Sequence, residues 1–593
     1  MCLHSVGNRL LVRFPQRCGG GSTSLVLAGP SAASDPSARP QRAPPWGLSV
    51  RTRRTSPVGG EKLEHRSNPV LDADWPDPDV LRVGDDYWMI ASSFHRAPGL
   101  PVLRSQDLVT WEHVTNALPA LVPEEHYALP RRGSGVWAPS IREHAGTFHI
   151  VYPDPDHGIF VLDAPHPAGP WSAPRLLLAG RGLIDPCPLW DEDGRAYLVH
   201  GWARSRARVK NRLSLLEVTP DLSAALSPSQ VIIDGADLPG MLTLEGPKAY
   251  RQGGWYWIYA PAGGVADGYQ VVFRARELHG PYEHRIVLEQ DSSPVNGPHQ
   301  GALVDDVHGD WWFVHFQDRG VFGRVTHVQP VRFDAEGWPH MGEPIDEVRG
   351  RPVAAVPALG QRGDAPAEPA AELAAEPATS VLPYEEPLRS DDFRAAQLHP
   401  RWHWQANPQR SWHRCGEGRL DLAFGRSPRG DLRDLPTVLG QQLPGQPSTW
   451  TTSVHLPAVA DGGAAGTERA GAVVLGHSYA WAGLRRDAEG IALVHGTMAE
   501  DAAEEETRTH RVLTADPTAE ASLSLRIDVD AAGRITLRAE DSVLLEDWQA
   551  AKGHWVGAEV GLFATVESMV HHDLTERRAS FGPVTVHREG REI

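Results

Sequence analysis

The sequence predicts an all-β protein in which a five-bladed β-propeller is followed by a β-sandwich. Short runs of apolar and aromatic residues alternate with Gly, Asp and Pro turns, and segments with a helical period are scarce. A weak repeat with five copies covers the first half of the chain. A stretch rich in Ala, Pro and Glu, typical of a semi-rigid linker, separates it from a second half that also consists of strand patterns.

The repeat predicts the propeller. Each copy starts with a polar or aromatic residue near Pro or Gly, continues into an apolar strand, and crosses a turn into a strand rich in aromatic residues. The copies start at Asp77, Trp137, Asp185, Glu245 and His299, with spacings of 60, 48, 60 and 54 residues. These spacings match a four-stranded blade with its loops.

The second half contains a clear hairpin pattern. Residues 523–529 alternate between apolar and polar side chains, and a turn at 530–533 leads into a second strand at 535–538. Such alternation is typical of strands with one buried face. Trp402 and Trp404 stand near the linker, where burial against the propeller would stabilise both halves, so we expect the halves to pack together.

Composition shifts define the expected boundaries. We expect a disordered or mis-started extension at 1–66, the propeller at 67–350, the linker at 351–385 and the sandwich at 386–593. The first 66 residues carry 10 Lys and Arg against 3 Asp and Glu and lack the apolar run of a signal peptide. We therefore expect a cytoplasmic protein.

Composition also excludes several classes of protein. With 41% hydrophobic and 22% charged residues, the 593-residue chain is neither collagenous nor mostly disordered. A net charge of -18 argues against nucleic acid as a partner, and no run of 18 apolar residues predicts a membrane span. The four cysteines include no CxxC pair, which argues against a disulfide scaffold and structural zinc. Nothing in the sequence indicates an oligomeric state.

Three carboxyl groups are expected to meet on the propeller axis. Equivalent positions of a repeat lie at equivalent places around the axis, so Asp77, Asp185 and Glu245 should converge. Because like charges repel, at least one of their pKa values should rise. A protonated carboxyl beside an ionised one is what acid/base hydrolysis of an acetal requires.

Seven ordered segments of the first half resemble glycoside hydrolase family 43, in its β-xylosidase and α-L-arabinofuranosidase branch. The segments are 68–71 with 75–80, 84–88 with 92–94, 136–139, 183–186 with 191–194, 245–247, 297–301, and 323–324 with 329–330. In the second half, 402–408 and 555–563 resemble the concanavalin-like sandwich that follows many such catalytic domains.

The resemblance implies a reaction and roles for the carboxyl groups. It implies an exo-acting hydrolase that releases xylose or L-arabinose from hemicellulose fragments and inverts the anomeric centre. Asp77 would be the general base, Glu245 the general acid, and Asp185 would orient Glu245 and raise its pKa. Inversion requires room for a water, hence carboxyl groups about 6.5–9.5 Å apart.

Four further residues each have two interpretations. Phe94 and Trp137 are either core aromatics or walls that stack on a sugar. Arg324 is either a surface cation or, as the resemblance implies, a guanidinium beside sugar hydroxyls. His299 either fills the axis or, as the resemblance implies, faces an axial ion such as calcium, although calcium prefers oxygen ligands.

Two other functions compete with hydrolysis. A sugar-binding propeller without turnover would need the aromatic walls but gains nothing from a carboxyl with a raised pKa. A glycoside phosphorylase would need several cations for phosphate, and only Arg324 is expected at the pocket.

Among the remaining candidates, Cys187 is interpreted as a small buried residue. The acids near Asp-Pro and Asp-Gly turns are interpreted as turn residues, namely Asp79, Asp85, Asp86, Asp191 and Asp193.

Overall fold

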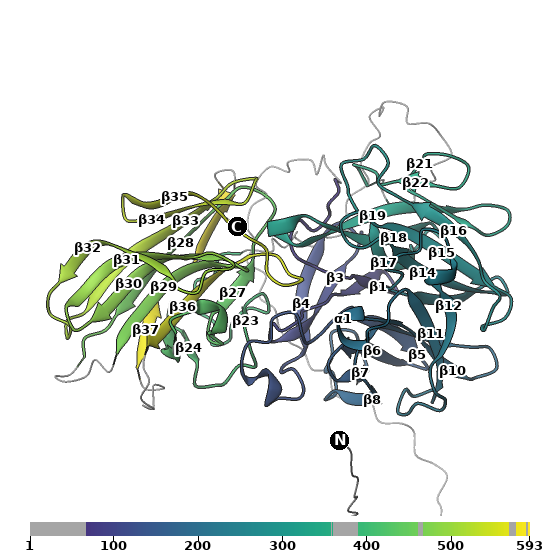
Figure 1. The fold of residues 1–593 in the computed structure, drawn as a ribbon, viewed down its shortest axis with the longest axis horizontal. Coiled ribbons are helices and arrows are strands. Elements are labelled where there is room, and N and C mark those ends of the chain that lie inside the picture. Colours follow the sequence, from purple (N-terminus) through teal and green to yellow (C-terminus); the bar gives the residue numbers. More distant parts are fainter. Residues whose placement is uncertain are drawn as a thin grey trace, which may run out of the picture. The chain divides into compact units, whose positions relative to one another are not determined.

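The structure is a computed structural model that describes residues 67–356, 359, 389–427, 429–459, 466–567, 577–588 and 591–592. It contains a five-bladed β-propeller and a β-sandwich, as predicted (Figure 1). The expected extension at 1–66 and most of the expected linker lie outside the described residues. Within the described part of the chain, no helix is long and apolar enough to cross a membrane.

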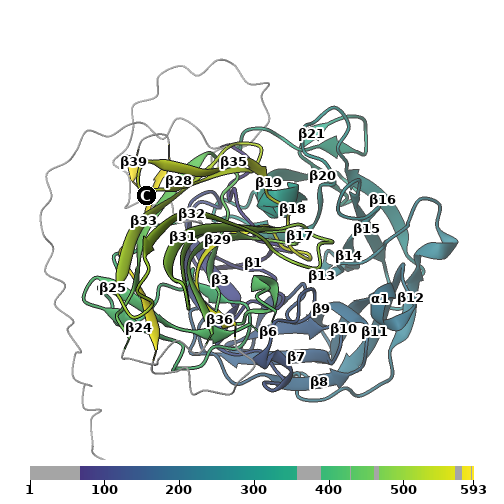
Figure 2. The ribbon, with the colours of Figure 1, turned by 60° about the vertical axis from the view of Figure 1, so that its left-hand side comes forward.

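Each blade is an antiparallel sheet of four consecutive strands (Figure 2). The first two blades are β1 (Asp79–Val83), β2 (Asp86–Ile90), β3 (Gly99–Ser105), β4 (Trp111–Leu118), and β5 (Ser140–His144), β6 (Thr147–Asp154), β7 (Gly158–Ala164), β8 (Arg175–Ala179). The third blade is β9 (Leu183–Trp190), β10 (Ala196–Trp202), β11 (Arg212–Val218), β12 (Gln230–Asp234). The last two are β13 (Lys248–Gln252), β14 (Trp255–Ala262), β15 (Tyr269–Ala275), β16 (Glu283–Leu288), and β17 (His299–Asp305), β18 (Trp311–Asp318), β19 (Arg324–Phe333), β20 (Pro339–Met341).

A separate hydrophobic cluster fills the space between each pair of neighbouring blades. Cys187 belongs to the cluster between the third and fourth blades, where it is fully buried, as expected for a small core residue. The cluster between the fifth and first blades closes the ring, with Val304 and Val314 against Val80 and Met89. Burial of these apolar faces holds the blades side by side.

Both ends of the propeller segment contribute to ring closure. Leu71 pairs with Thr326 of β19, and the Asn68 side chain donates hydrogen bonds of 2.9 Å to the carbonyls of Val328 and Val353. Ala355 pairs with Ser67, and Val356 is buried in the cluster that closes the ring. The short strands β21 (Glu343–Pro344) and β22 (Gly350–Arg351) extend the fourth blade. The first residues of the expected linker, 351–356, therefore pack on the propeller.

The sandwich consists of two facing sheets around one core. The first sheet has the order β23 (His403–Trp404), β27 (Leu439–Gln442), β36 (Glu559–Glu567), β29 (Thr467–Leu475), β30 (Tyr479–Asp487), β31 (Gly490–Met498), β32 (Glu506–Thr514). The second has the order β24 (His413–Gly416), β25 (Arg419–Ala423), β37 (Arg578–Phe581), β28 (Ser448–Leu456), β33 (Ala521–Val529), β34 (Arg534–Ala539), β35 (Ser542–Gln549). The short strands β26 (Gly425–Arg426), β38 (Thr585–Arg588) and β39 (Arg591–Glu592) lie beside them. The hairpin predicted from the alternation at 523–529 is confirmed as β33 and β34.

The helices within the described residues are short, namely η1 (His126–Ala128), α1 (Arg204–Ala207), η2 (Gly235–Asp237), η3 (Gly320–Phe322) and η4 (Leu432–Asp434).

Buried polar contacts join the propeller to the sandwich. Trp404 exchanges backbone hydrogen bonds of 2.7 and 3.1 Å with Ala97. Arg96 pairs with Asp74 at 2.8 Å and with Glu559 of the sandwich at 3.6 Å, and it donates to the carbonyl of Gly557. All three charged side chains are buried. The expected packing of the two halves is thus observed, and Trp402 and Trp404 are buried in the sandwich core.

Asp79 is not a turn residue. It lies in β1, fully buried, and accepts hydrogen bonds from the Arg142 guanidinium at 2.6 Å and the Ile141 amide at 2.7 Å. The Lys248 ammonium lies 3.6 Å away. The prediction of a turn was wrong because the innermost strand begins at this residue, where its carboxylate links the first blade to the second and fourth.

We expect Arg96→Met to lower the free energy of unfolding by about 3–5 kcal/mol, since it leaves Asp74 and Glu559 buried without their shared cation. Arg104→Met is the matched control, because Arg104 pairs with Asp86 in a partly exposed ion pair. Loss of this partly exposed ion pair should lower the free energy of unfolding by about 1 kcal/mol or less. Urea unfolding of the full chain measures both, and equal losses would contradict the structural role of Arg96.

Candidate active site

A cavity of about 330 Å³ opens at the propeller axis. It is lined by six of the seven residues predicted for the site, namely Asp77, Phe94, Trp137, Asp185, Glu245 and Arg324. The seventh, His299, is buried within electrostatic reach of Asp77 and Arg324. The structure therefore brings the predicted residues together in one place, while their chemical roles stay predictions.

The blade starts aim these side chains at the cavity. Asp77, Asp185 and Gln300 occupy corresponding places in three blades, at or just before the innermost strand, and have φ values of 55°, 55° and 51°. This left-handed conformation costs roughly 1–2 kcal/mol for a residue with a Cβ atom. Backbone strain of this kind is typical of functional sites whose geometry the surrounding fold enforces.

The Asp77 carboxyl group is held by two donors. Arg324 donates to one oxygen at 2.8 Å, and the Ser92 hydroxyl donates to the other at 2.5 Å. Arg324 comes from the fifth blade and Asp77 from the first. Their ion pair is almost completely buried, so the orientation of the carboxyl group is tightly fixed.

Asp185 and Glu245 form an interacting pair of carboxyl groups. Burial raises the pKa of Asp185, and the charge of Asp77 raises it further, while the Gly246 amide, which donates at 2.8 Å, opposes the shift. Burial and the nearby charge of Asp185 hold the pKa of Glu245 well above its usual range, against the opposing charge of Arg324. Glu245 is therefore suited to donate a proton at neutral pH.

Aromatic rings form the walls of the cavity. The Trp137 ring lies 6.1 Å from Phe94 and 6.0 Å from Trp555, measured between ring centroids. The Arg324 guanidinium lies 5.8 Å from the Phe94 ring and 5.7 Å from the Trp555 ring. Together these groups offer flat apolar faces and one fixed cation, which suits a sugar ring.

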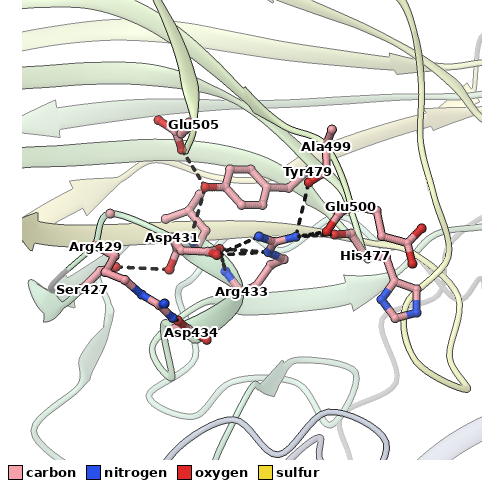
Figure 3. A network of polar contacts seen from close by, with 12 residues as sticks. Ser427, Arg429, Asp431, Arg433, Asp434, His477, Tyr479, Ala499, Glu500 and Glu505 are labelled. Atoms are coloured by element: carbon pink, nitrogen blue, oxygen red, sulfur yellow. Dashed lines mark hydrogen bonds and ion pairs between the residues drawn. The ribbon is translucent and has the colours of Figure 1, made fainter. Parts of the chain in front are cut away.

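Trp555 comes from the sandwich, in the segment between β35 and β36. Its ring packs edge-on against His554 at 5.5 Å, and His554 packs against His477 at 5.7 Å. Figure 3 shows how this support is anchored: Arg433 donates to the carbonyls of His477 and Glu500 and pairs with Asp431. The sandwich thus supplies part of the cavity wall from a loop that other residues of the sandwich hold in place.

His299 is a neutral, buried side chain. Burial lowers its pKa to about 4, its Nδ1 lies 2.7 Å from the Gly297 carbonyl, and its Nε2 has no hydrogen-bond partner. Among the described residues, no group of three or more His, Cys, Asp or Glu side chains could hold a metal. One imidazole nitrogen alone does not fit calcium, so the axial calcium stays a prediction and carries no step of the chemistry below.

Sequence reasoning missed several residues of the cavity. Gln300 lies inside a segment that the resemblance identified and Trp555 opens another, so a signal existed for both. The same holds for Ser92, which donates to Asp77 but does not line the cavity. Other lining residues come from segments without a recognisable pattern, namely Arg204 and Ser205 of α1 and the loop residues Thr243 and Val265.

The raised pKa of Glu245 should appear in the stability of the fold. In the unfolded chain Glu245 loses its proton at its ordinary pKa, whereas in the folded chain it keeps the proton to higher pH. Wild-type stability should therefore fall as pH rises from the ordinary range of a carboxyl group through the raised pKa of Glu245. Glu245→Gln removes this loss, so the variant should gain stability over the wild type, on the order of 2 kcal/mol, between pH 5 and pH 8.

Urea unfolding at the two pH values measures the effect. The control is Glu277→Gln, which changes an exposed glutamate. An equal pH dependence of the wild type and Glu245→Gln would show that Glu245 keeps an ordinary pKa in the folded protein.

Comparisons with known proteins agree with this geometry. A family model described as glycosyl hydrolases family 43 matches residues 66–339, and one described as the β-xylosidase C-terminal concanavalin A-like domain matches 390–573. A putative β-xylosidase of Xylanibacter ruminicola is 36% identical over 417 residues, which cover 69% of this chain and 72% of that protein. A non-reducing end α-L-arabinofuranosidase of Bacteroides ovatus is 31% identical over 46% of this chain and 53% of its own length.

Solved structures share the fold over both domains. The xylan β-1,4-xylosidase of Bacillus halodurans superposes with a TM-score of 0.70 and 22% identity, covering 88% of this chain and all of that one. The axial carboxyl groups and the aromatic walls agree with these matches. On the evidence of the family models and the relatives, the chain belongs to glycoside hydrolase family 43.

Proposed function

We propose that this protein is an exo-acting, inverting glycoside hydrolase that releases xylose, L-arabinose or both from the non-reducing ends of hemicellulose-derived oligosaccharides. The observation that carries the proposal is that one cavity contains two carboxyl groups in different electrostatic surroundings. The pKa of Glu245 is raised, whereas Asp77 is paired with Arg324. Relatives with xylosidase and arabinofuranosidase names support this choice of sugars.

In the proposed reaction, Asp77 accepts a proton from a water molecule whose oxygen bonds to the anomeric carbon. The glycosidic C–O bond breaks on the opposite face, and Glu245 gives its proton to the departing oxygen. Asp185 keeps Glu245 protonated through its charge and is a positioning residue. Because one displacement exchanges the substituents, the anomeric configuration inverts.

The walls favour cleavage at a chain end. The cavity of about 330 Å³ is at the small end of the range for ligand pockets, and Trp555 and Trp137 close it from the sandwich and the propeller. Such a space suits one terminal sugar with a short continuation rather than the middle of a long chain.

A sugar-binding propeller without turnover is the alternative. The aromatic walls would serve it equally well. Burying Asp185 and Glu245 side by side weakens the fold at neutral pH and adds no binding contact that a neutral amide could not supply. The carboxyl pair therefore favours hydrolysis.

The proposal is tested with purified protein on 4-nitrophenyl β-D-xylopyranoside, 4-nitrophenyl α-L-arabinofuranoside and xylotriose. We expect Glu245→Gln to be partly spared on the aryl glycosides, because 4-nitrophenolate leaves without protonation, and nearly inactive on xylotriose. Asp77→Asn should lose about 10²–10⁴-fold on both, since water must still be activated. NMR of the first product should show the inverted anomer.

Two results would contradict these roles. One is an equal loss of kcat by Glu245→Gln on aryl glycosides and xylotriose, and the other is a first product with retained configuration. Absence of hydrolysis of all three substrates by the wild type would favour the binding alternative.

Asp185→Asn should shift the pH profile. Removing the charge beside Glu245 lowers the pKa of Glu245, so the alkaline limb of kcat/KM should move to lower pH. The matched control is Asp193→Asn, in the exposed turn at the far end of β9, which should leave the limb in place. A limb that stays fixed in Asp185→Asn would show that Asp185 has no electrostatic influence on the acid.

A further inference from the structure

A strongly basic segment borders the cavity. Residues 204–212 contain five cations in a chain whose net charge is -18, and they follow β10 directly through α1. Arg204 and Ser205 line the cavity itself. The segment, called here the basic rim, was not singled out by any sequence pattern and is not used by the acid and base.

The basic rim is anchored on both sides of α1. The Ala203 amide donates to the Gly182 carbonyl at 2.8 Å. Arg206 pairs with Asp156 at 3.3 Å and lies 5.5 Å from the Trp137 ring. The Asn211 side chain accepts a 2.5 Å hydrogen bond from the amide of Thr243, two residues before Glu245. The rim is therefore held at a fixed place beside the acid.

Three of its cations are not neutralised. Arg206 and Arg212 are paired with Asp156 and Asp234. Arg204, Arg208 and Lys210 are exposed and make no ion pair or side-chain hydrogen bond with the part of the chain that the structure describes. The 263–268 loop, which lines the cavity through Gly264 and Val265, carries one acid, Asp267. The two segments that border the cavity, 204–212 and 263–268, thus carry more unpaired cations than acids.

The excess charge lies on the side of the acid. The charge of Lys210 acts on Glu245 and opposes the rise of its pKa, whereas the cation beside Asp77 is Arg324. In an inverting displacement the leaving group departs beside the acid, and the nucleophile arrives beside the base. Of the unpaired cations, Arg204 lines the cavity and Lys210 acts on the acid, so these two lie on the side of the part of the substrate that leaves.

We propose that the basic rim binds the carboxylate of a uronic acid carried on the leaving part of the oligosaccharide, so that acidic hemicellulose fragments are preferred substrates. This proposal rests on the proposed function. Exposed guanidinium and ammonium groups on a fixed loop form charge-assisted hydrogen bonds with a carboxylate. A phosphate that served as nucleophile would have to approach beside Asp77 instead, so the rim does not make the protein a phosphorylase.

The test compares xylotriose with the same trisaccharide carrying glucuronic acid on its second residue. The wild type should show a higher kcat/KM for the acidic substrate at low salt. The ratio of acidic to neutral kcat/KM should fall about fivefold in Arg204→Gln/Lys210→Gln, the size expected for losing two exposed charge contacts. Raising the ionic strength from 0.01 to 1 M should abolish the preference, because the Debye length falls from about 30 Å to about 3 Å.

The matched control is Arg195→Gln/Arg276→Gln, which removes two exposed charges on turns and strand ends outside the cavity lining. Its substrate ratio should equal that of the wild type. A wild type without preference, or a rim variant with an unchanged ratio, overturns the inference while the proposed function stands. Release of a sugar phosphate in phosphate buffer would instead refute the proposed hydrolysis, because phosphate rather than water would then be the nucleophile. Failure to cleave either trisaccharide or the aryl glycosides refutes the proposed function itself.

Discussion

The buried ion pair between Asp77 and Arg324 is the contact on which the rest of the site depends. It joins the start of the first blade to β19 of the last, so it lies across the closure of the propeller. The same guanidinium opposes the rise in the pKa of Glu245 and stands against the rings of Phe94 and Trp555. One side chain therefore orients one carboxyl group, tunes another and forms part of the sugar-facing wall.

The sandwich is connected to this ion pair through a short chain of buried contacts. The Arg324 amide donates to the Asp74 carboxylate at 3.0 Å, and Asp74 pairs with Arg96, which reaches Glu559 and Gly557 of the sandwich. The segment that ends at Gly557 also carries Trp555. Since both the support of Arg324 and one wall of the cavity involve the sandwich, the second domain is part of the catalytic unit rather than an attachment to it.

The axial carboxyl groups could be predicted from the sequence because residues at the same place in each copy of a repeat lie at the same place in each blade. Five copies of one pattern imply one axis, and residues at the starts of the copies must meet there. Trp555 could not be placed in this way, since its contact with the cavity depends on how two domains dock. The prediction of a turn at Asp79 was wrong because Asp near Pro is common in turns, and only the closed ring reveals the two cations beside it, Arg142 and Lys248. The basic rim could not be predicted from the repeat, because its segment occurs in one blade only.

The closure of the ring has a consequence for how such chains acquire further domains. Ser67 pairs with Ala355, and the Asn68 amide donates to the Ala354 carbonyl at 2.9 Å, so the two ends of the propeller segment lie side by side. A ring whose ends meet can be cut out of one polypeptide and spliced into another without opening its sheets. Modules can be fused before or after it while the axial geometry is inherited intact. A fused domain can then complete the cavity from outside the ring, as the sandwich does here with Trp555, while the carboxyl groups at the axis come from the propeller alone.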